Sequence, residues 1–139
     1  MVEPQSTRRL LNVLLDSLSD LRRYRAGVTR DELGGQRDIQ HMVLHALYVA
    51  VQAAVDLAMH AGADEGLPEA STYQDAFRRL ADAGLIERDL AGRLAGWAGF
   101  RNVLAHLYAT IDYDRVYDAL QETGDLEAFA KIVSRTLPP

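Results

Sequence analysis

Four side chains that can bind a phosphate or move a proton lie within eight residues of each other: Arg101, Asn102, His106 and Tyr108. A guanidinium is a fixed cationic fork for phosphate oxygens. An imidazole exchanges a proton near neutral pH, and a tyrosine offers a hydroxyl and an aromatic face. Such a set could cleave an RNA phosphodiester without a metal, with His106 withdrawing the 2′-hydroxyl proton and Arg101 stabilising the charged phosphorane. The residue types equally allow a structural, hydrogen-bonded histidine and a salt-bridged arginine.

A second polar group interrupts the apolar segment 38–60. At about 100° per residue, one stripe of a helix, with Tyr48 at its margin, carries His41, His45, Gln52, Asp56 and His60. The first two histidines have the i, i+4 spacing of a metal chelate, and the last two residues repeat it. The stripe is open to three interpretations: a solvated or subunit-facing surface, part of a nucleic-acid or partner surface, or a metal site. Because no other segment offers a matching ligand set, we expect the first of these, with no metal and no cofactor.

Helices must position these groups. Leu and Ala together number 40 residues, against 20 for Val, Ile and Thr combined, and two long segments lack proline. Apolar periodicity predicts helices over 7–24, 38–60, 71–83, 87–108, 112–123 and from 125 onward. The chain is therefore expected to be an all-α bundle with short connections.

Two segments have the spacing of a helix-initiating capping box: Thr29 with Glu32, and Ser71 with Gln74. Gly34 and Gly35 follow the first box directly, so we place the start of the second helix after them, at Asp38. The second box opens the third helix.

The first and fourth predicted helices each carry a distinctive face. The apolar face of the first consists of leucines at positions 10, 14, 18 and 21, broadened by those at 11 and 15. The fourth groups small residues on one side: Gly92, Ala95, Gly96 and Gly99. Since each glycine inside a helix costs about 1 kcal/mol relative to alanine, these glycines predict close approach of another helix, within the bundle or across a dimer.

Length and composition limit the class of protein. A chain of 139 residues with 48% hydrophobic and 25% charged residues is typical of one globular domain, here 1–139. The net charge of −5 disfavours broad nucleic-acid binding, although 14 of the 15 basic residues are arginine. The absence of cysteine excludes disulfides and thiolate chemistry. With no signal peptide and no uninterrupted apolar segment of membrane-spanning length, we expect a cytoplasmic protein without a membrane partner.

The spacing Arg-x4-His-x-Tyr, carried by Arg101, His106 and Tyr108, resembles the signature of the HEPN superfamily of all-helical ribonuclease and nucleotide-handling domains. More narrowly, the chain resembles HepT-type toxins, the partners of MntA-type nucleotidyltransferase antitoxins. The resemblance covers the leucine-rich first helix and the segments 37–40, 73–80, 100–102 and 111–117.

This resemblance implies a bundle of four to five main helices that forms a homodimer, with the motif of each subunit at a shared cleft. It also implies the toxin of a bacterial toxin–antitoxin system, acting as a metal-independent endoribonuclease on an RNA substrate. Arg101 and His106 would be the catalytic pair, Asn102 a supporting residue, and Tyr108 the residue that the MntA-type antitoxin adenylylates with ATP. The alternative is a non-catalytic HEPN module that binds a nucleotide or a partner protein.

Helical geometry adds a constraint on the motif. On a regular helix, Arg101 and His106 point about 140° apart, whereas Asn102 and His106 share a face. Unless the helix distorts or ends near His106, Arg101 and His106 of one subunit cannot easily hold one phosphate. Acid–base cleavage also needs two proton-transfer groups, and each chain supplies one motif histidine. A two-fold dimer satisfies both requirements.

Overall fold

A computed structural model describes residues 4–106 and 110–137 of the chain, without the side chains of Pro4 and His106. Within these residues there are helices and no strands, so the predicted all-α class is confirmed. The helices are α1 (Pro4–Gly27), α2 (Arg30–Gly35), α3 (Arg37–Asp64), α4 (Tyr73–Asp82), α5 (Arg88–His106), α6 (Tyr113–Gln121) and α7 (Gly124–Thr136).

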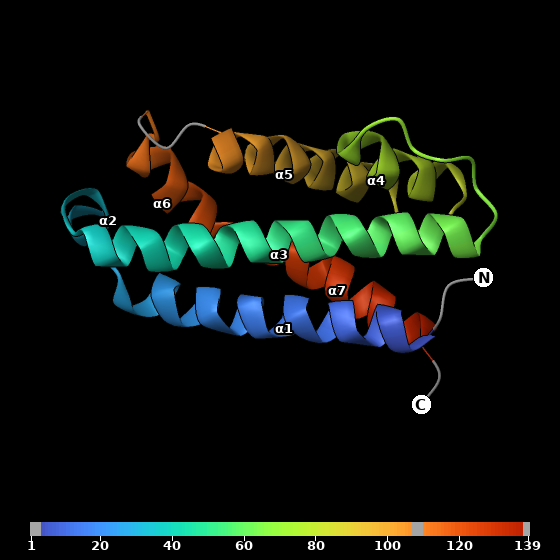
Figure 1. Ribbon diagram of the computed structural model, residues 1–139, viewed down its shortest axis with the longest axis horizontal. Helices are drawn as coiled ribbons and strands as arrows, with labels where there is room; N and C mark the ends of the chain where they lie inside the picture. The colour runs from blue at the N-terminus through green and yellow to red at the C-terminus, as the bar shows by residue number, and fades with distance from the viewer. Residues whose placement is uncertain (1–3, 107–109, 138–139) are drawn as a thin grey trace.

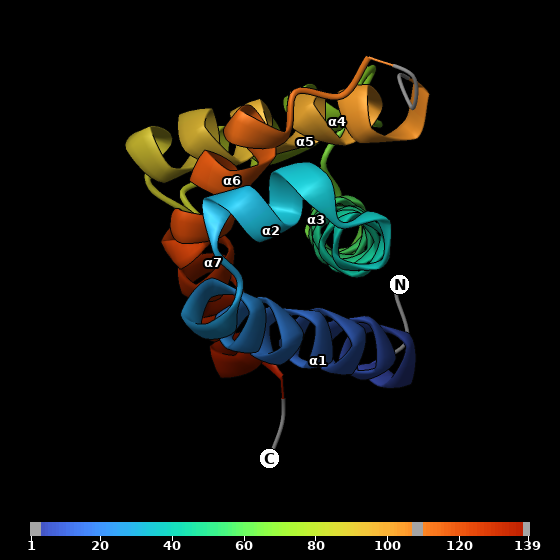
Figure 2. The same ribbon diagram turned by 90° about the vertical axis from the view of Figure 1, so that its left-hand side faces the viewer.

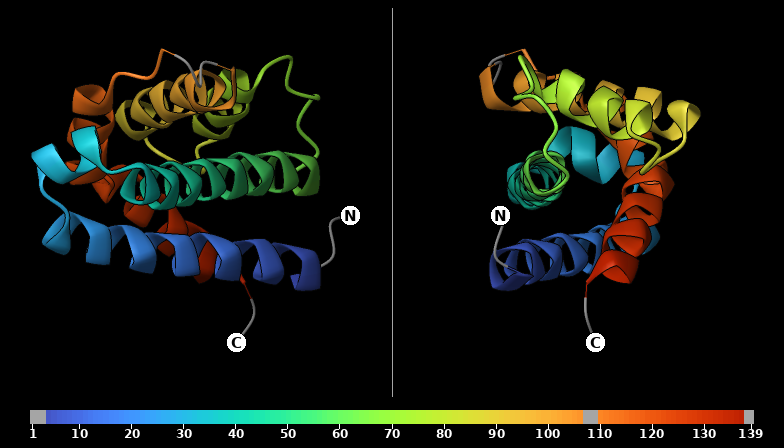
Figure 3. Two further views of the ribbon diagram at one scale, coloured as in Figure 1. Left: turned by 60° about the vertical axis from the view of Figure 1, so that its left-hand side comes forward. Right: turned by 90° about the vertical axis from the view of Figure 1, so that its right-hand side faces the viewer.

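The helices are stacked around α3, which lies between α1 on one side and the α4–α5 pair on the other (Figure 1). Viewed from the end, α7 runs along the side of this stack and contacts α1, α3 and α5, while α2 and α6 pack together at one end (Figure 2). Helix α1 begins and α7 ends at the opposite end (Figure 3). A helix that is apolar on most sides belongs in the middle of a bundle, as α3 is.

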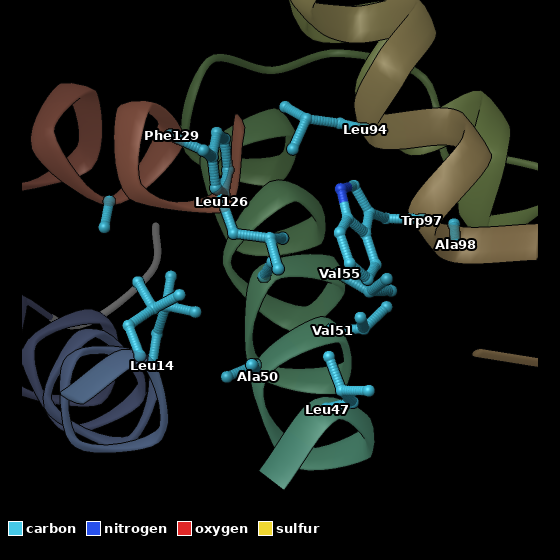
Figure 4. Packing of buried hydrophobic residues seen from close by; sticks show 14 of the residues in the cluster. Leu14, Leu47, Ala50, Val51, Val55, Leu94, Trp97, Ala98, Leu126 and Phe129 are labelled. Carbon is cyan, nitrogen blue, oxygen red and sulfur yellow. The ribbon is translucent and has the colours of Figure 1, made fainter. Parts of the chain in front are cut away.

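The core forms where α3 meets its neighbours. Its side chains at Leu47, Ala50, Val51 and Val55 are fully buried and face residues of α1, α5 and α7 (Figure 4). Helix α3 is also the one described helix long and apolar enough to cross a membrane by length and composition alone, with a mean hydropathy of 1.6 over its most apolar window. Because 56% of that window is buried inside the bundle, its apolar character is that of a central core helix.

The predicted apolar face of α1 is correct except at one position. Leu14, Leu18 and Leu21 are at most 1% exposed, and Leu11 is buried, with Leu10 packed at the core's margin. Leu15, in contrast, is 44% exposed. It follows Leu14 by about 100° around the helix, which turns its side chain away from α3 and α7.

This neighbouring pair gives a direct test of the packing. We expect Leu14→Ala to lower the free energy of unfolding by about 2–5 kcal/mol, because it leaves a cavity where the side chain was fully buried. The matched variant Leu15→Ala should cost less than about 1 kcal/mol. Urea unfolding followed by circular dichroism measures both changes, and equal losses would contradict the arrangement of α1.

A short helix that was not expected, α2, precedes the central one. The predicted capping box is present: Thr29 Oγ1 accepts from the Glu32 backbone N–H at 3.1 Å, and Glu32 Oε1 accepts from the Thr29 N–H at 3.0 Å. The bond from the Thr29 backbone N–H, and then one from the Thr29 side chain, hold the pKa of the Glu32 carboxyl below its ordinary value. The helix continues through Gly34 and Gly35 because Leu33 anchors it in the core with no exposed surface.

The start of α4 differs from the prediction by one residue. The cap is Thr72, whose Oγ1 accepts from the Asp75 backbone N–H at 3.0 Å, rather than Ser71. Ser71 instead donates to the Asp75 carboxylate through its backbone N–H. The hydrogen bond from Arg79, and then the one from Ser71, lower the pKa of Asp75.

The remaining helix ends are close to those predicted. Helix α3 begins one residue before the predicted Asp38 and runs to Asp64, past Gly62. Helix α5 starts one residue after the predicted 87, while its predicted end at Tyr108 falls outside the described residues. Asp112 caps α6, with its carboxylate accepting from two backbone N–H groups of the first turn.

The glycines of α5 fit the predicted close approach at one position only. A Cβ at Gly99 would lie 3.4 Å from Gln74 Nε2 of α4, so this glycine admits the neighbouring helix. A Cβ at Gly92 or Gly96 would meet nothing within 4 Å, so the expectation of an intrachain contact there is wrong. A role for these two glycines across a dimer stays a prediction.

Candidate active site

The guanidinium of Arg101 is held between α3 and α5 by neutral hydrogen-bond partners. Its Nε donates to Gln52 Oε1 at 2.9 Å, and its Nη2 donates to Tyr48 Oη at 3.1 Å. Its Nη1 donates to Asn102 Oδ1, on the next residue of α5, at 3.2 Å. Three different nitrogen atoms of the group are therefore fixed in direction. Arg101 is partly buried and Asn102 is exposed, so the assembly lies at the surface of the bundle.

Two tyrosine rings complete the surroundings of Arg101. Its Cζ lies 5.2 Å from the ring centroid of Tyr48 on α3 and 5.3 Å from that of Tyr73, the first residue of α4. Cation–π attraction at such distances stabilises a guanidinium without neutralising it. Tyr73 directly follows the Thr72 cap, and the next residue, Gln74, is the one that contacts α5 at Gly99.

The charge environment of Arg101 differs from that of Arg30 and of Arg93, its neighbour on the same helix. Arg30 binds Asp114 and Asp118, and Arg93 binds Asp125, and these carboxylates raise the pKa of both guanidinium groups. Among the described residues, no carboxylate lies within ion-pair distance of Arg101. Its guanidinium is thus oriented by three hydrogen bonds and has no ion pair among the described residues, so it can form charge-assisted hydrogen bonds to a phosphate without first breaking an ion pair.

The polar stripe of α3 divides into parts with different surroundings. Tyr48 and Gln52 contact Arg101, and Gln52 Nε2 donates to Asp56 Oδ1 at 3.0 Å. His41 and His45 are exposed nearer the start of α3. The sequence placed Gln52 and Asp56 on one stripe, but their proximity to Arg101, and that of Tyr73, was not predicted.

His60 lies at the other end of α3, far along the helix from Gln52. It lines a cavity together with residues of α1, α4 and α7, among them Thr7, Leu80 and Phe129, and its Nδ1 is buried without a hydrogen-bond partner. Among the side chains that the structure describes, which do not include that of His106, no three His, Asp or Glu residues are grouped closely enough to hold a metal ion. The polar residues of the α3 stripe therefore lie in separate surroundings and do not converge on a single binding site.

The remaining two motif residues are His106 and Tyr108. Helix α5 extends to His106, but the side chain of His106 and the whole of Tyr108 lie outside the described residues. Their predicted roles stay predictions. Of the predicted site residues, the structure brings Arg101 and Asn102 together.

A family model and a related protein of known function both place the chain in the same family. The family model described as "Ribonuclease HepT-like" matches residues 14–135. The mRNA nuclease HepT of Shewanella oneidensis is 30% identical over 98 residues, which cover 68% of this chain and 72% of that protein.

Two solved structures show the same fold. A tri-AMPylated Shewanella oneidensis HEPN toxin, solved in complex with its MNT antitoxin, superposes with a TM-score of 0.84 at 20% identity, covering 97% of this chain and 99% of that one. YutE of Bacillus subtilis, a cytosolic protein of unknown function, superposes with a TM-score of 0.83 at 12% identity, covering 99% of this chain and 96% of that one.

Proposed function

Because the chain belongs to the HepT-like ribonuclease family, we propose that it is a metal-independent endoribonuclease and the toxin of a bacterial toxin–antitoxin pair that acts in the cytoplasm. The observation that carries the proposal is the environment of Arg101. A surface guanidinium held by Gln52, Tyr48 and Asn102, with no carboxylate paired to it among the described residues, is preorganised for the phosphate of an RNA strand.

The proposed reaction uses the 2′-hydroxyl of the substrate as the nucleophile. His106 takes the hydroxyl proton, and the 2′ oxygen attacks the adjacent phosphorus. The bond from phosphorus to the 5′ oxygen breaks, leaving a 2′,3′-cyclic phosphate on one product and, after protonation, a 5′-hydroxyl on the other. Arg101 binds the non-bridging oxygens, whose negative charge increases in the phosphorane.

A homodimer supplies the second proton-transfer group. Each chain carries one motif histidine, and positions five apart on a regular helix, such as 101 and 106, are about 140° apart around its axis. In the proposed dimer, His106 of the partner subunit protonates the leaving 5′ oxygen. A monodisperse monomer that cleaves RNA at the full rate would contradict this arrangement.

The regulation of the proposed activity is adenylylation of Tyr108 by an MntA-type nucleotidyltransferase antitoxin. Support comes from the HEPN toxin of similar fold, which was solved tri-AMPylated and in complex with an MNT antitoxin. Tyr108 is two residues after His106, so a nucleotide attached to its hydroxyl would be close in sequence to both catalytic residues.

RNA cleavage by the purified chain tests the proposed function. We expect cleavage of single-stranded RNA to continue in excess EDTA, because no step requires a metal. His106→Ala should abolish cleavage while RNA binding and the circular dichroism spectrum are retained. Cleavage that EDTA stops would contradict the mechanism. Binding of RNA by a wild-type chain that never cleaves it would favour the non-catalytic HEPN module.

A further inference from the structure

We propose that Gln52 is a positioning residue that fixes the direction of Arg101 without forming an ion pair with it, and that Asp56 orients the Gln52 amide for this task. The proposal rests on the proposed function of Arg101 as the phosphate-binding group. It concerns two residues of α3 that lie 49 and 45 positions before Arg101 in the sequence and that the Arg-x4-His motif does not include.

The hydrogen bonds around Gln52 determine which way its amide lies. Arg101 Nε can only donate, so the amide oxygen must face it, and the distance between the two is 2.9 Å. The Asp56 carboxylate can only accept, so the amide nitrogen must face it, at 3.0 Å. A reversed amide would place two donors together at Arg101 and two acceptors together at Asp56. Asp56 therefore selects the orientation that holds Arg101.

The spacing of the two residues on α3 favours the hydrogen bond between them. Gln52 and Asp56 are one helical turn apart on the same face, and both are partly buried. The bond to a carboxylate also polarises the amide, which strengthens the Gln52 oxygen as an acceptor for Arg101. Asp56 thus acts on Arg101 through an amide instead of forming an ion pair with it.

A neutral residue at position 52 matters because a carboxylate there would compete with the substrate. Glutamate has nearly the shape of glutamine and could accept the same bond from Arg101 Nε. It would, however, form a charge-assisted pair with the guanidinium, as Asp125 does with Arg93 at 2.9 Å. A phosphate would then have to displace that pair before it could bind.

A charge-swap experiment separates orientation from charge. The double variant Gln52→Glu/Asp56→Asn keeps the net charge and a complete hydrogen-bond chain, but it moves the negative charge from position 56 onto the partner of Arg101. Binding of a short fluorescent single-stranded RNA is measured by anisotropy in a His106→Ala background, which prevents cleavage. We expect the double variant to bind at least about tenfold more weakly than Asp56→Asn alone.

Two comparisons make the binding result decisive. Asp16→Asn removes an exposed carboxylate of α1 and controls for a general change of charge. Thermal unfolding of every variant controls for stability. If the charge-swap variant binds RNA as tightly as Asp56→Asn, the requirement for a neutral residue at position 52 is wrong.

A readout without RNA tests the positioning role on its own. In the wild-type chain, the Arg101 Nε–H should exchange slowly with solvent in 1H–15N spectra, its signal being identified by its loss in Arg101→Lys. Gln52→Leu removes the acceptor and should accelerate that exchange, whereas unchanged exchange would overturn the positioning role. A wild-type chain that neither binds nor cleaves RNA would overturn the proposed function instead, and the exchange measurement would still decide what Gln52 does.

Discussion

Replacing Arg101 by alanine should lower the rate of RNA cleavage by about 100-fold or more and relieve the growth arrest caused by expressing the chain alone. The substitution removes the cation that is held without a paired carboxylate between Tyr48, Gln52 and Tyr73. Its loss removes charge stabilisation from the phosphorane more than from the ground state, so the rate constant should fall more than RNA affinity. Cleavage kinetics and growth curves measure the two effects.

Two further variants sharpen this prediction. Arg93→Ala removes an arginine of the same helix that is exposed and paired with Asp125, so cleavage should be unaffected. Arg101→Lys keeps the positive charge, but an ammonium group lacks the planar set of donors that a guanidinium presents to a phosphate. Its cleavage rate should therefore stay below that of the wild-type chain. If Arg101→Ala is folded by circular dichroism and remains as active and as toxic as the parent chain, the ribonuclease assignment fails.

Incubation with the cognate nucleotidyltransferase antitoxin and ATP should add AMP to Tyr108 and abolish RNA cleavage. In this step the Tyr108 hydroxyl oxygen attacks the α-phosphorus of ATP, pyrophosphate leaves, and the hydroxyl proton is released. The new phosphodiester carries a negative charge that could pair with Arg101, which has no ion pair among the described residues. It would occupy the group that RNA needs, and the attached adenosine would obstruct access. Intact-mass analysis and a cleavage assay of the same sample measure both outcomes.

A neighbouring tyrosine provides the control for this modification. Tyr113, the first residue of α6, is five positions after Tyr108. Tyr113→Phe should still gain AMP, whereas Tyr108→Phe should not. AMP that maps to another residue and is still added to Tyr108→Phe, or a mass that never changes, would refute Tyr108 as the regulatory residue.

Much of the fold could be predicted because its signals are local. The leucine spacing of α1, the capping box at Thr29 and the nearly continuous apolar character of α3 each depend on residues a few positions apart. Local signals gave the wrong helix boundary where two alternative boundaries differ little in free energy. Ser71 and Thr72 are both able to cap α4, and only the packed chain selects Thr72. In the same way, Gly34 and Gly35 remain helical because Leu33 is buried in the core.

The sequence by itself determined the all-helical class, the leucine spacing of α1, and the motif that identifies Arg101 as a candidate catalytic residue. Only the tertiary structure decided what surrounds Arg101. A helical period shows which residues share a face, but it does not show which face of one helix meets which face of another. The contacts of Arg101 with Gln52, Tyr48 and Tyr73 join three helices over sequence separations that no local signal spans. Because packing of the whole bundle sets the crossing of α3, α4 and α5, the neutral surroundings of this cation are a property of the fold rather than of the motif.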